Sequence, residues 1–167
     1  MLIRTEKEND RTAVFAVNVS AFETPSEAAL VEVLREQARP VVSLVAEDNG
    51  NIVGHIMFTP VFLSGYPDLN VMGLAPLAVA PEHQGKGAGS ALVRAGLEQC
   101  RQLGFVAVVV LGHPDYYPRF GFSPSSRFGI DSDYDVPEEV FMALELEPEA
   151  LMGKNGRVKY HAAFRNV

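Results

Sequence analysis

The pattern of apolar and polar positions at the start of the chain predicts one short strand followed by two helices. Leu2-Ile3-Arg4 is a brief apolar start, and from about Asp10 to Ala21 apolar residues recur at helical spacing. Thr24-Pro25-Ser26-Glu27 predicts the start of a second helix, with Thr24 as N-cap and Glu27 completing a capping box. This helix must end by about residue 39, because Pro40 cannot continue it.

The middle of the chain predicts a β-hairpin and then a strand, a helix and a second strand. Residues 41–47 and 52–58 are rich in β-branched residues on either side of Asn49-Gly50, a pair typical of hairpin turns. Residues 59–70 predict a loop, because they contain prolines, a glycine and polar residues. A strand ending at Ala80, a helix over 88–103 and an apolar strand over 105–111 then predict a right-handed βαβ unit with parallel strands.

The last third of the chain is less regular. Residues 112–137 are rich in turn residues, and strands are predicted near 140–146 and over 157–164. With the preceding elements this gives an α+β fold with a mixed sheet of about six to seven strands flanked by helices.

Length and charge limit the class of protein. A chain of 167 residues with 47% hydrophobic residues suits one domain over 1–167, built on one core. The net charge of −7 disfavours nucleic acid or an anionic membrane as partner, since both attract basic surfaces, and it favours a cationic substrate.

The remaining composition indicates a soluble cytoplasmic protein. The only cysteine, Cys100, excludes an intramolecular disulfide and a cysteine metal cluster, so no metal is expected. No apolar run reaches the roughly 20 residues that span a bilayer, and the first residues become charged too soon for a signal peptide. Monomer and homodimer both remain open.

A glycine-rich turn separates the strand ending at Ala80 from the helix that begins near residue 88. Gly85, Gly87 and Gly89 lack side chains, so backbone N–H groups could approach phosphate oxygens, helped by the positive end of the helix dipole. The segment is not a P-loop, because that motif needs a glycine at position 80 and a hydroxyl residue at position 87. It is not a dinucleotide fingerprint either, because Ser90 replaces the third glycine.

The pattern Gln84-x-x-Gly87-x-Gly89, directly after Leu77-Ala78-Val79-Ala80-Pro81, resembles the signature of the GNAT superfamily of acetyl-CoA-dependent N-acyltransferases. The order of predicted elements over most of the chain is similar to that of this family. The resemblance implies acetyl-CoA as co-substrate and an amine as acceptor. The cofactor-binding residues it implies are Leu77, Ala78, Val79, Gln84, Gly85, Lys86, Gly87, Ala88, Gly89 and Ser90.

A second segment, Asp115-Tyr116-Tyr117-Pro118-Arg119-Phe120-Gly121-Phe122, resembles another GNAT signature. By this resemblance Tyr117 is the catalytic acid that protonates the departing thiolate of coenzyme A, while Tyr116 is mainly a packing residue. A phenol can act as such a donor. Gly112-His113-Pro114 stands where many GNAT members carry a cofactor-binding Asn, and whether His113 replaces it stays open.

The sequence leaves the general base and the acceptor undecided. Glu27, Glu23, His55 and His161 are candidate bases, each of which also has an ordinary structural explanation. The interpretation favoured by both signatures is direct acetyl transfer to an amine. The alternatives are a catalytically weak acyl-CoA-binding or sensing domain, and a nucleotide-binding α/β domain.

Overall fold

The computed structural model describes residues 1–166 and is built on a nine-stranded mixed sheet. Seven strands follow the order β1 (Leu2–Thr5), β2 (Val42–Asp48), β3 (Asn51–Leu63), β4 (Val71–Val79), β5 (Ala107–Leu111), β8 (Phe141–Glu145) and β6 (Ser123–Pro124). The strands β7 (Ile130–Ser132) and β9 (Gly156–Lys159) pair with each other, and β9 also pairs with the end of β3. The sequence did not predict β6 and β7. They lie within residues 112–137 and are too short to give a periodic pattern of apolar residues.

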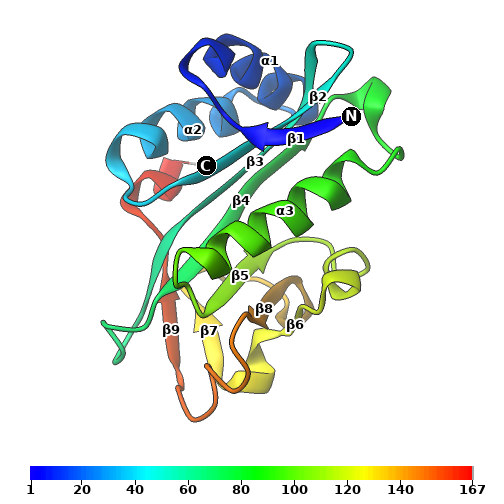
Figure 1. Cartoon of the computed structure of the whole chain (residues 1–167). Coiled ribbons are helices and arrows are strands. Elements are labelled where there is room, and N and C mark those ends of the chain that lie inside the picture. Colours follow the sequence, from blue (N-terminus) through cyan, green and yellow to red (C-terminus); the bar gives the residue numbers. More distant parts are fainter. Residues whose placement is uncertain (167) are drawn as a thin grey trace.

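Helices cover both faces of the sheet (Figure 1). The helix α3 (Ala88–Gln102) packs on one face, where Leu92 and Val93 join a core cluster with Leu44 and Phe58. The helices α1 (Arg11–Ala21) and α2 (Ser26–Gln37) pack on the other face against side chains such as Met57. Neighbouring strand residues point to opposite faces, so the alternation along β2 and β3 supplies both cores.

Shorter 3₁₀ helices connect these elements: η1 (Glu8–Asp10), η2 (Pro81–His83), η3 (Tyr117–Phe120), η4 (Ser125–Phe128), η5 (Glu138–Val140) and η6 (Ala162–Asn166). The prediction of one strand over 157–164 is wrong at its end, because β9 stops at Lys159 and the chain turns into η6. This turn places Phe164 in the core beside α2. No pattern in the nearby sequence predicts that position.

The predicted hairpin is confirmed, although its second strand is longer than expected. Asn49 and Gly50 have φ angles of 52° and 83°, which suit the two central positions of a tight hairpin turn. Residues 59–63 are not loop but the end of β3, where Val61 pairs with β4 and Leu63 with β9. Partners on two strands therefore outweigh the strand-breaking tendency of Pro60.

The start of α2 also differs from the prediction. The helix begins at Ser26 with Pro25 at the N-cap position, and no side-chain capping bond is formed. The Thr24 hydroxyl instead accepts a hydrogen bond of 3.3 Å from the Ser26 N–H. Glu27 therefore does not complete a capping box, and its carboxylate is left without that explanation.

The parallel strands β4 and β5 separate halfway along β4. Their pairing runs from Val71–Ala107 to Leu74–Val110 and then stops, while β4 continues to Val79. The register between β3 and β4 shifts at the same level, between Ile56 and Phe58. The predicted βαβ unit is confirmed, and its two strands splay apart beyond Leu74.

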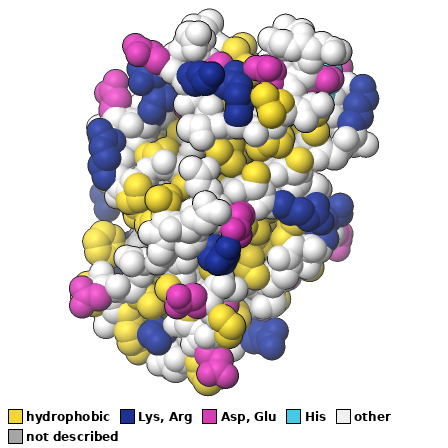
Figure 2. Space-filling model, in the orientation of Figure 1, with side chains coloured by type: hydrophobic (Ala, Val, Ile, Leu, Met, Phe, Trp, Pro, Cys, Tyr) yellow, Lys and Arg dark blue, Asp and Glu magenta, His cyan; other side chains and the backbone are white. Residues whose placement is uncertain are grey.

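The face shown in Figure 2 carries acidic and basic side chains interspersed, with hydrophobic atoms exposed between them. Within the described part of the chain, no helix is both long and apolar enough to cross a membrane.

Candidate active site

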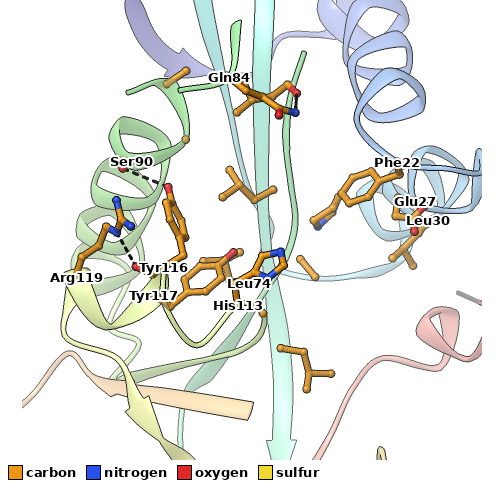
Figure 3. Close-up of a pocket in the computed structure, with 18 of the residues that line it drawn as sticks. Phe22, Glu27, Leu30, Leu74, Gln84, Ser90, His113, Tyr116, Tyr117 and Arg119 are labelled. Atoms are coloured by element: carbon orange, nitrogen blue, oxygen red, sulfur yellow. Dashed lines mark hydrogen bonds between the residues drawn. The ribbon is translucent and has the colours of Figure 1, made fainter. Parts of the chain in front are cut away.

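The splayed strands open a cavity of about 870 Å³ between the two helical layers. Its wall contains segments of β4, the glycine turn, the first turn of α3, the end of β5 and η3, together with residues of the α1–α2 region and the C-terminal segment. In Figure 3 Ser90, Tyr116 and Arg119 lie on the α3 side, Phe22, Glu27 and Leu30 lie on the α2 side, and Tyr117 and His113 lie between them. The cavity thus has two ends: α3 and η3 form one, and the α1–α2 region and the C-terminal segment form the other.

The backbone of β4 offers free hydrogen-bonding groups to this cavity. The Ala80 N–H donates to the Val53 carbonyl of β3 at 2.9 Å. Hydrogen-bonded and non-bonded pairs alternate along an antiparallel ladder, so Ala78 also bonds to β3 whereas Leu77 and Val79 direct their backbone groups away from it. Those groups face the gap left by β5, and both residues line the cavity. Within residues 1–166, only the Val79 carbonyl among these groups has a hydrogen-bond partner, the Gln84 side-chain amide, which donates to it at 3.0 Å.

The glycine turn has the shape that close approach of a ligand requires. Gly85 and Gly87 have φ angles of 76° and 91°, which side-chain-bearing residues rarely adopt, and Gly87 is the N-cap of α3. Nothing lies within 4 Å of the position that a β-carbon would occupy at either residue. Backbone N–H groups at the N-terminus of α3 are therefore accessible from the cavity, as phosphate binding requires.

Two of the residues expected to bind the cofactor do not line the cavity. Ala78 is buried with its backbone engaged by β3, and Lys86 is exposed on the turn. The other eight, Leu77, Val79, Gln84, Gly85, Gly87, Ala88, Gly89 and Ser90, all line it.

Tyr116 and Arg119 line the cavity, although sequence reasoning treated Tyr116 as packing and did not single out Arg119. The Tyr116 hydroxyl lies 3.2 Å from the Ser90 hydroxyl, so it faces the first turn of α3. A β-carbon at Gly89 would lie 3.1 Å from this hydroxyl oxygen, which shows how closely η3 approaches α3. Arg119 stacks its guanidinium 4.5 Å from the centre of the Tyr116 ring. The signal that could have identified Arg119 is a cation within the same short segment as the tyrosine pair.

Tyr117 lies at the junction of the two ends of the cavity (Figure 3). Its side chain is 7% exposed, and burial, with a smaller effect from Tyr116, raises the pKa of its phenol well above its ordinary value. The ring packs on Phe122 with a centroid separation of 5.7 Å. No hydrogen bond to the Tyr117 hydroxyl is formed within residues 1–166, so this group is free to donate to a ligand.

Only one of the four candidate bases lines the cavity. Glu23 is exposed on the loop before α2. His55 is fully buried between Asn18 and Ser43, and the His161 Nδ1 accepts the Ala163 N–H at 3.0 Å. Glu27 is the candidate that the fold brings to the cavity.

The site suits a long ligand that carries phosphates. Accessible amides at the start of α3 and the Arg119 side chain lie on one side of the cavity, and unpaired backbone of β4 lies in the middle, where it can hydrogen-bond to an extended ligand. No cluster of three or more potential metal-ligating His, Cys, Asp or Glu side chains occurs in the described chain.

Three features lie together in this site: parallel strands that separate, a helix N-terminus suited to bind phosphate, and a buried phenol. This combination is typical of acyl-CoA-dependent transferases. Residues 11–122 match the Acetyltransferase (GNAT) family. The chain is 38% identical over 165 residues to YhbS of Escherichia coli K12, an uncharacterized N-acetyltransferase, and the match covers 98% of both chains. It is 42% identical over 155 residues to YjhQ of the same strain, also an uncharacterized N-acetyltransferase, covering 87% of this chain and 86% of YjhQ.

Solved structures agree with these sequence matches. The crystal structure of E. coli YhbS in complex with CoA matches with a TM-score of 0.92 at 37% identity, covering 98% of this chain and 91% of that chain. A GNAT family acetyltransferase from Brucella melitensis in complex with acetyl-CoA matches with a TM-score of 0.81 at 36% identity, covering 98% and 97%. The chain belongs to the GNAT family of acetyltransferases, which confirms the family, the mixed α+β fold and the enzyme class predicted from the sequence.

Proposed function

We propose that residues 1–167 form a single acetyltransferase domain that moves the acetyl group of acetyl-CoA directly to an amine, with Tyr117 as the general acid. The observation that carries this proposal is that Tyr117 and the unpaired end of β4 line one and the same cavity. The likeness to structures that contain CoA and acetyl-CoA supports the same co-substrate for this chain.

Different groups of the chain would bind different parts of acetyl-CoA. The N–H groups of the turn at 85–90 would bind phosphate, and the free backbone groups of Leu77 and Val79 would hold the pantetheine arm in the gap beside β4. When bound, acetyl-CoA supplies an activated thioester. An N–H of the same strand edge would polarise the thioester carbonyl, as backbone donors do in acyl transfer.

Tyr117 would assist the departure of the thiolate. The ammonium group first loses a proton to solvent, and the neutral nitrogen then bonds to the carbonyl carbon. The carbon–sulfur bond breaks, the sulfur receives a proton from the phenol, and the second proton of the nitrogen restores the phenol. An ordinary phenol is already protonated throughout the neutral range, and burial raises the pKa of Tyr117 further, so its hydroxyl remains a donor there. Removing this donor should lower kcat much more than it weakens cofactor binding.

The test is thiol release from acetyl-CoA in the presence of a panel of amines, with wild type and Tyr117→Phe. We expect Tyr117→Phe to lower kcat by about 10²-fold or more and to leave the acetyl-CoA Kd within about threefold of wild type. Burial raises the pKa of the Cys100 thiol to about 12, so the protein's only thiol should not contribute to the signal.

Three outcomes would contradict the proposal. Full activity of Tyr117→Phe would remove the phenol from the mechanism. Acetyl-CoA binding without thiol release for any amine would instead favour a binding or sensing domain. Tight binding of ATP or NAD with none of acetyl-CoA, measured by calorimetry, would overturn the cofactor as well.

A further inference from the structure

The end of the cavity opposite the glycine turn contains polar atoms that the protein itself leaves unsatisfied. Four buried side-chain oxygens or nitrogens in the described chain have no hydrogen-bond partner. Two of them, Glu27 Oε2 and the Tyr160 hydroxyl oxygen, belong to residues that line the cavity. A buried polar atom without a partner is costly, and such atoms in a native structure are often partnered by a ligand or water.

The carboxylate of Glu27 is the more informative of the two. It lies in the first turn of α2 without a capping bond or an ion pair within residues 1–166. The residue is half-buried, and its Oε2 is the atom shielded from solvent. A carboxylate with a buried, unpartnered oxygen is stabilised most effectively by a cation that also donates hydrogen bonds, as an ammonium group does.

Charge is distributed unequally between the two ends of the cavity. Arg119 lies on the α3 side, stacked on Tyr116, whereas Glu27 lies on the α2 side, across β4 (Figure 3). The positive end suits phosphate groups and the negative end suits an ammonium group. The phosphates of the co-substrate and the ammonium group of the acceptor would thus each meet a surface of opposite charge.

The surface around Glu27 is apolar and largely aromatic. Tyr160 packs against Tyr134 and Phe164 with ring-centroid separations of 5.7 and 5.2 Å. The apolar residues at this end of the cavity are Phe22, Leu30, Tyr134, Val136, Tyr160 and Phe164. Such walls favour an acceptor with a hydrophobic body over a polyhydroxylated one, whose hydroxyls would lose water without replacement. A polyamine would bring further charges to a surface that offers one carboxylate.

We propose that Glu27 binds the ammonium group of the acceptor, and that the acceptor is a monocationic amine with an apolar or aromatic body. The inference rests on the proposed function, because it assigns the second substrate of that reaction. Glu27 is then the residue that determines specificity for charge, and the aromatic wall determines specificity for the body of the acceptor.

The first test is calorimetric binding of 2-phenylethylamine to the protein saturated with CoA, which needs no turnover. Glu27→Gln should weaken this binding at least tenfold while the affinity for CoA stays unchanged. Glu23→Gln is the matched control, because it removes the same charge close to the start of α2 from an exposed side chain outside the cavity. Tyr160→Phe, which removes a hydroxyl without a protein partner, should fold normally and weaken binding to a smaller extent.

The second test is turnover with 2-phenylethylamine, glucosamine and spermidine. We expect kcat/KM to be highest for 2-phenylethylamine and Glu27→Gln to raise its KM at least tenfold. Equal amine binding by wild type and Glu27→Gln, or a preference for glucosamine or spermidine, would overturn the inference. Amine binding that depends on Glu27 but leads to no thiol release would instead count against the proposed function alone.

Discussion

Gly112 lies so close to Tyr117 that a β-carbon on residue 112 would be 2.3 Å from Cε2 of the tyrosine ring. The Gly112 N–H also donates to the Val140 carbonyl at 2.9 Å, so the backbone that supports the ring is held in place. The position of the proposed acid therefore depends on the absence of a side chain at the end of β5.

Gly112→Ala should displace the Tyr117 ring and lower kcat to nearly the same extent as Tyr117→Phe. Because both changes remove the same donor, the double variant should be no slower than the slower single variant, by a double-mutant cycle on kcat. Multiplicative losses in the double variant would show that Gly112 acts on something other than Tyr117.

Gly87→Ala should weaken binding of acetyl-CoA by about tenfold or more, because it places a β-carbon in ligand space and strains a backbone with a φ of 91°. Gly104→Ala is the matched control, since Gly104 has a φ of 92°, has equally open surroundings and lies outside the cavity. Both variants should lose about 1–2 kcal/mol of stability. Calorimetry should show lost affinity only for Gly87→Ala, and equal affinities in the two variants would exclude a role for this turn.

Gly96→Ala tests the packing of α3 on the sheet. Helix propensity alone predicts that alanine stabilises a helix interior by about 1 kcal/mol. A β-carbon at residue 96 would lie 2.1 Å from Cε1 of the buried Phe58 ring, so we expect a net loss of about 1–3 kcal/mol instead. Urea unfolding measures whether the substitution lowers or raises the free energy of unfolding. A gain in stability would mean that α3 can shift away from β3 at little cost.

His55 should make the stability of the protein depend on pH. Burial lowers its pKa from 6.5 to about 4; the nearby Glu6 opposes this shift and Arg35 adds to it. The unfolded chain therefore binds a proton between pH 6.5 and about 4 that the folded state excludes. The stability that depends on neutral His55 is complete above pH 6.5 and falls with decreasing pH, by on the order of 3 kcal/mol at pH 4.

Comparing urea unfolding of wild type and His55→Gln between pH 7.5 and 4.5 isolates this contribution from that of the carboxylates. His83→Gln, at a partly exposed position, is the control and should follow wild type. NMR titration of the His55 ring gives the pKa directly, even if the variant does not fold. A pKa near 6.5 would contradict the prediction.

The chain's local signals determine a large part of the fold and the cofactor end of the site. Asn49-Gly50 fixes the hairpin, because few residues other than asparagine and glycine adopt two successive positive φ angles. The strand ending at Val79, the glycines and α3 are consecutive in sequence, so short-range patterning suffices to bring them together. The tyrosine pair is likewise a local motif, so the sequence alone predicts Tyr117 as the candidate acid.

Tertiary structure decided what depends on contacts between distant segments. Sequence could not show that Ala78 is engaged by β3 while Leu77 and Val79 face the gap, because this follows from the register with β3. Sequence explained Glu27 as a capping residue, whereas the fold packs α2 and the C-terminal segment around one cavity and leaves one oxygen of this carboxylate, Oε2, buried without a partner. Periodicity and turn chemistry act over a few residues, but burial and pairing are properties of the folded chain, and these distinguish the acceptor end of the site.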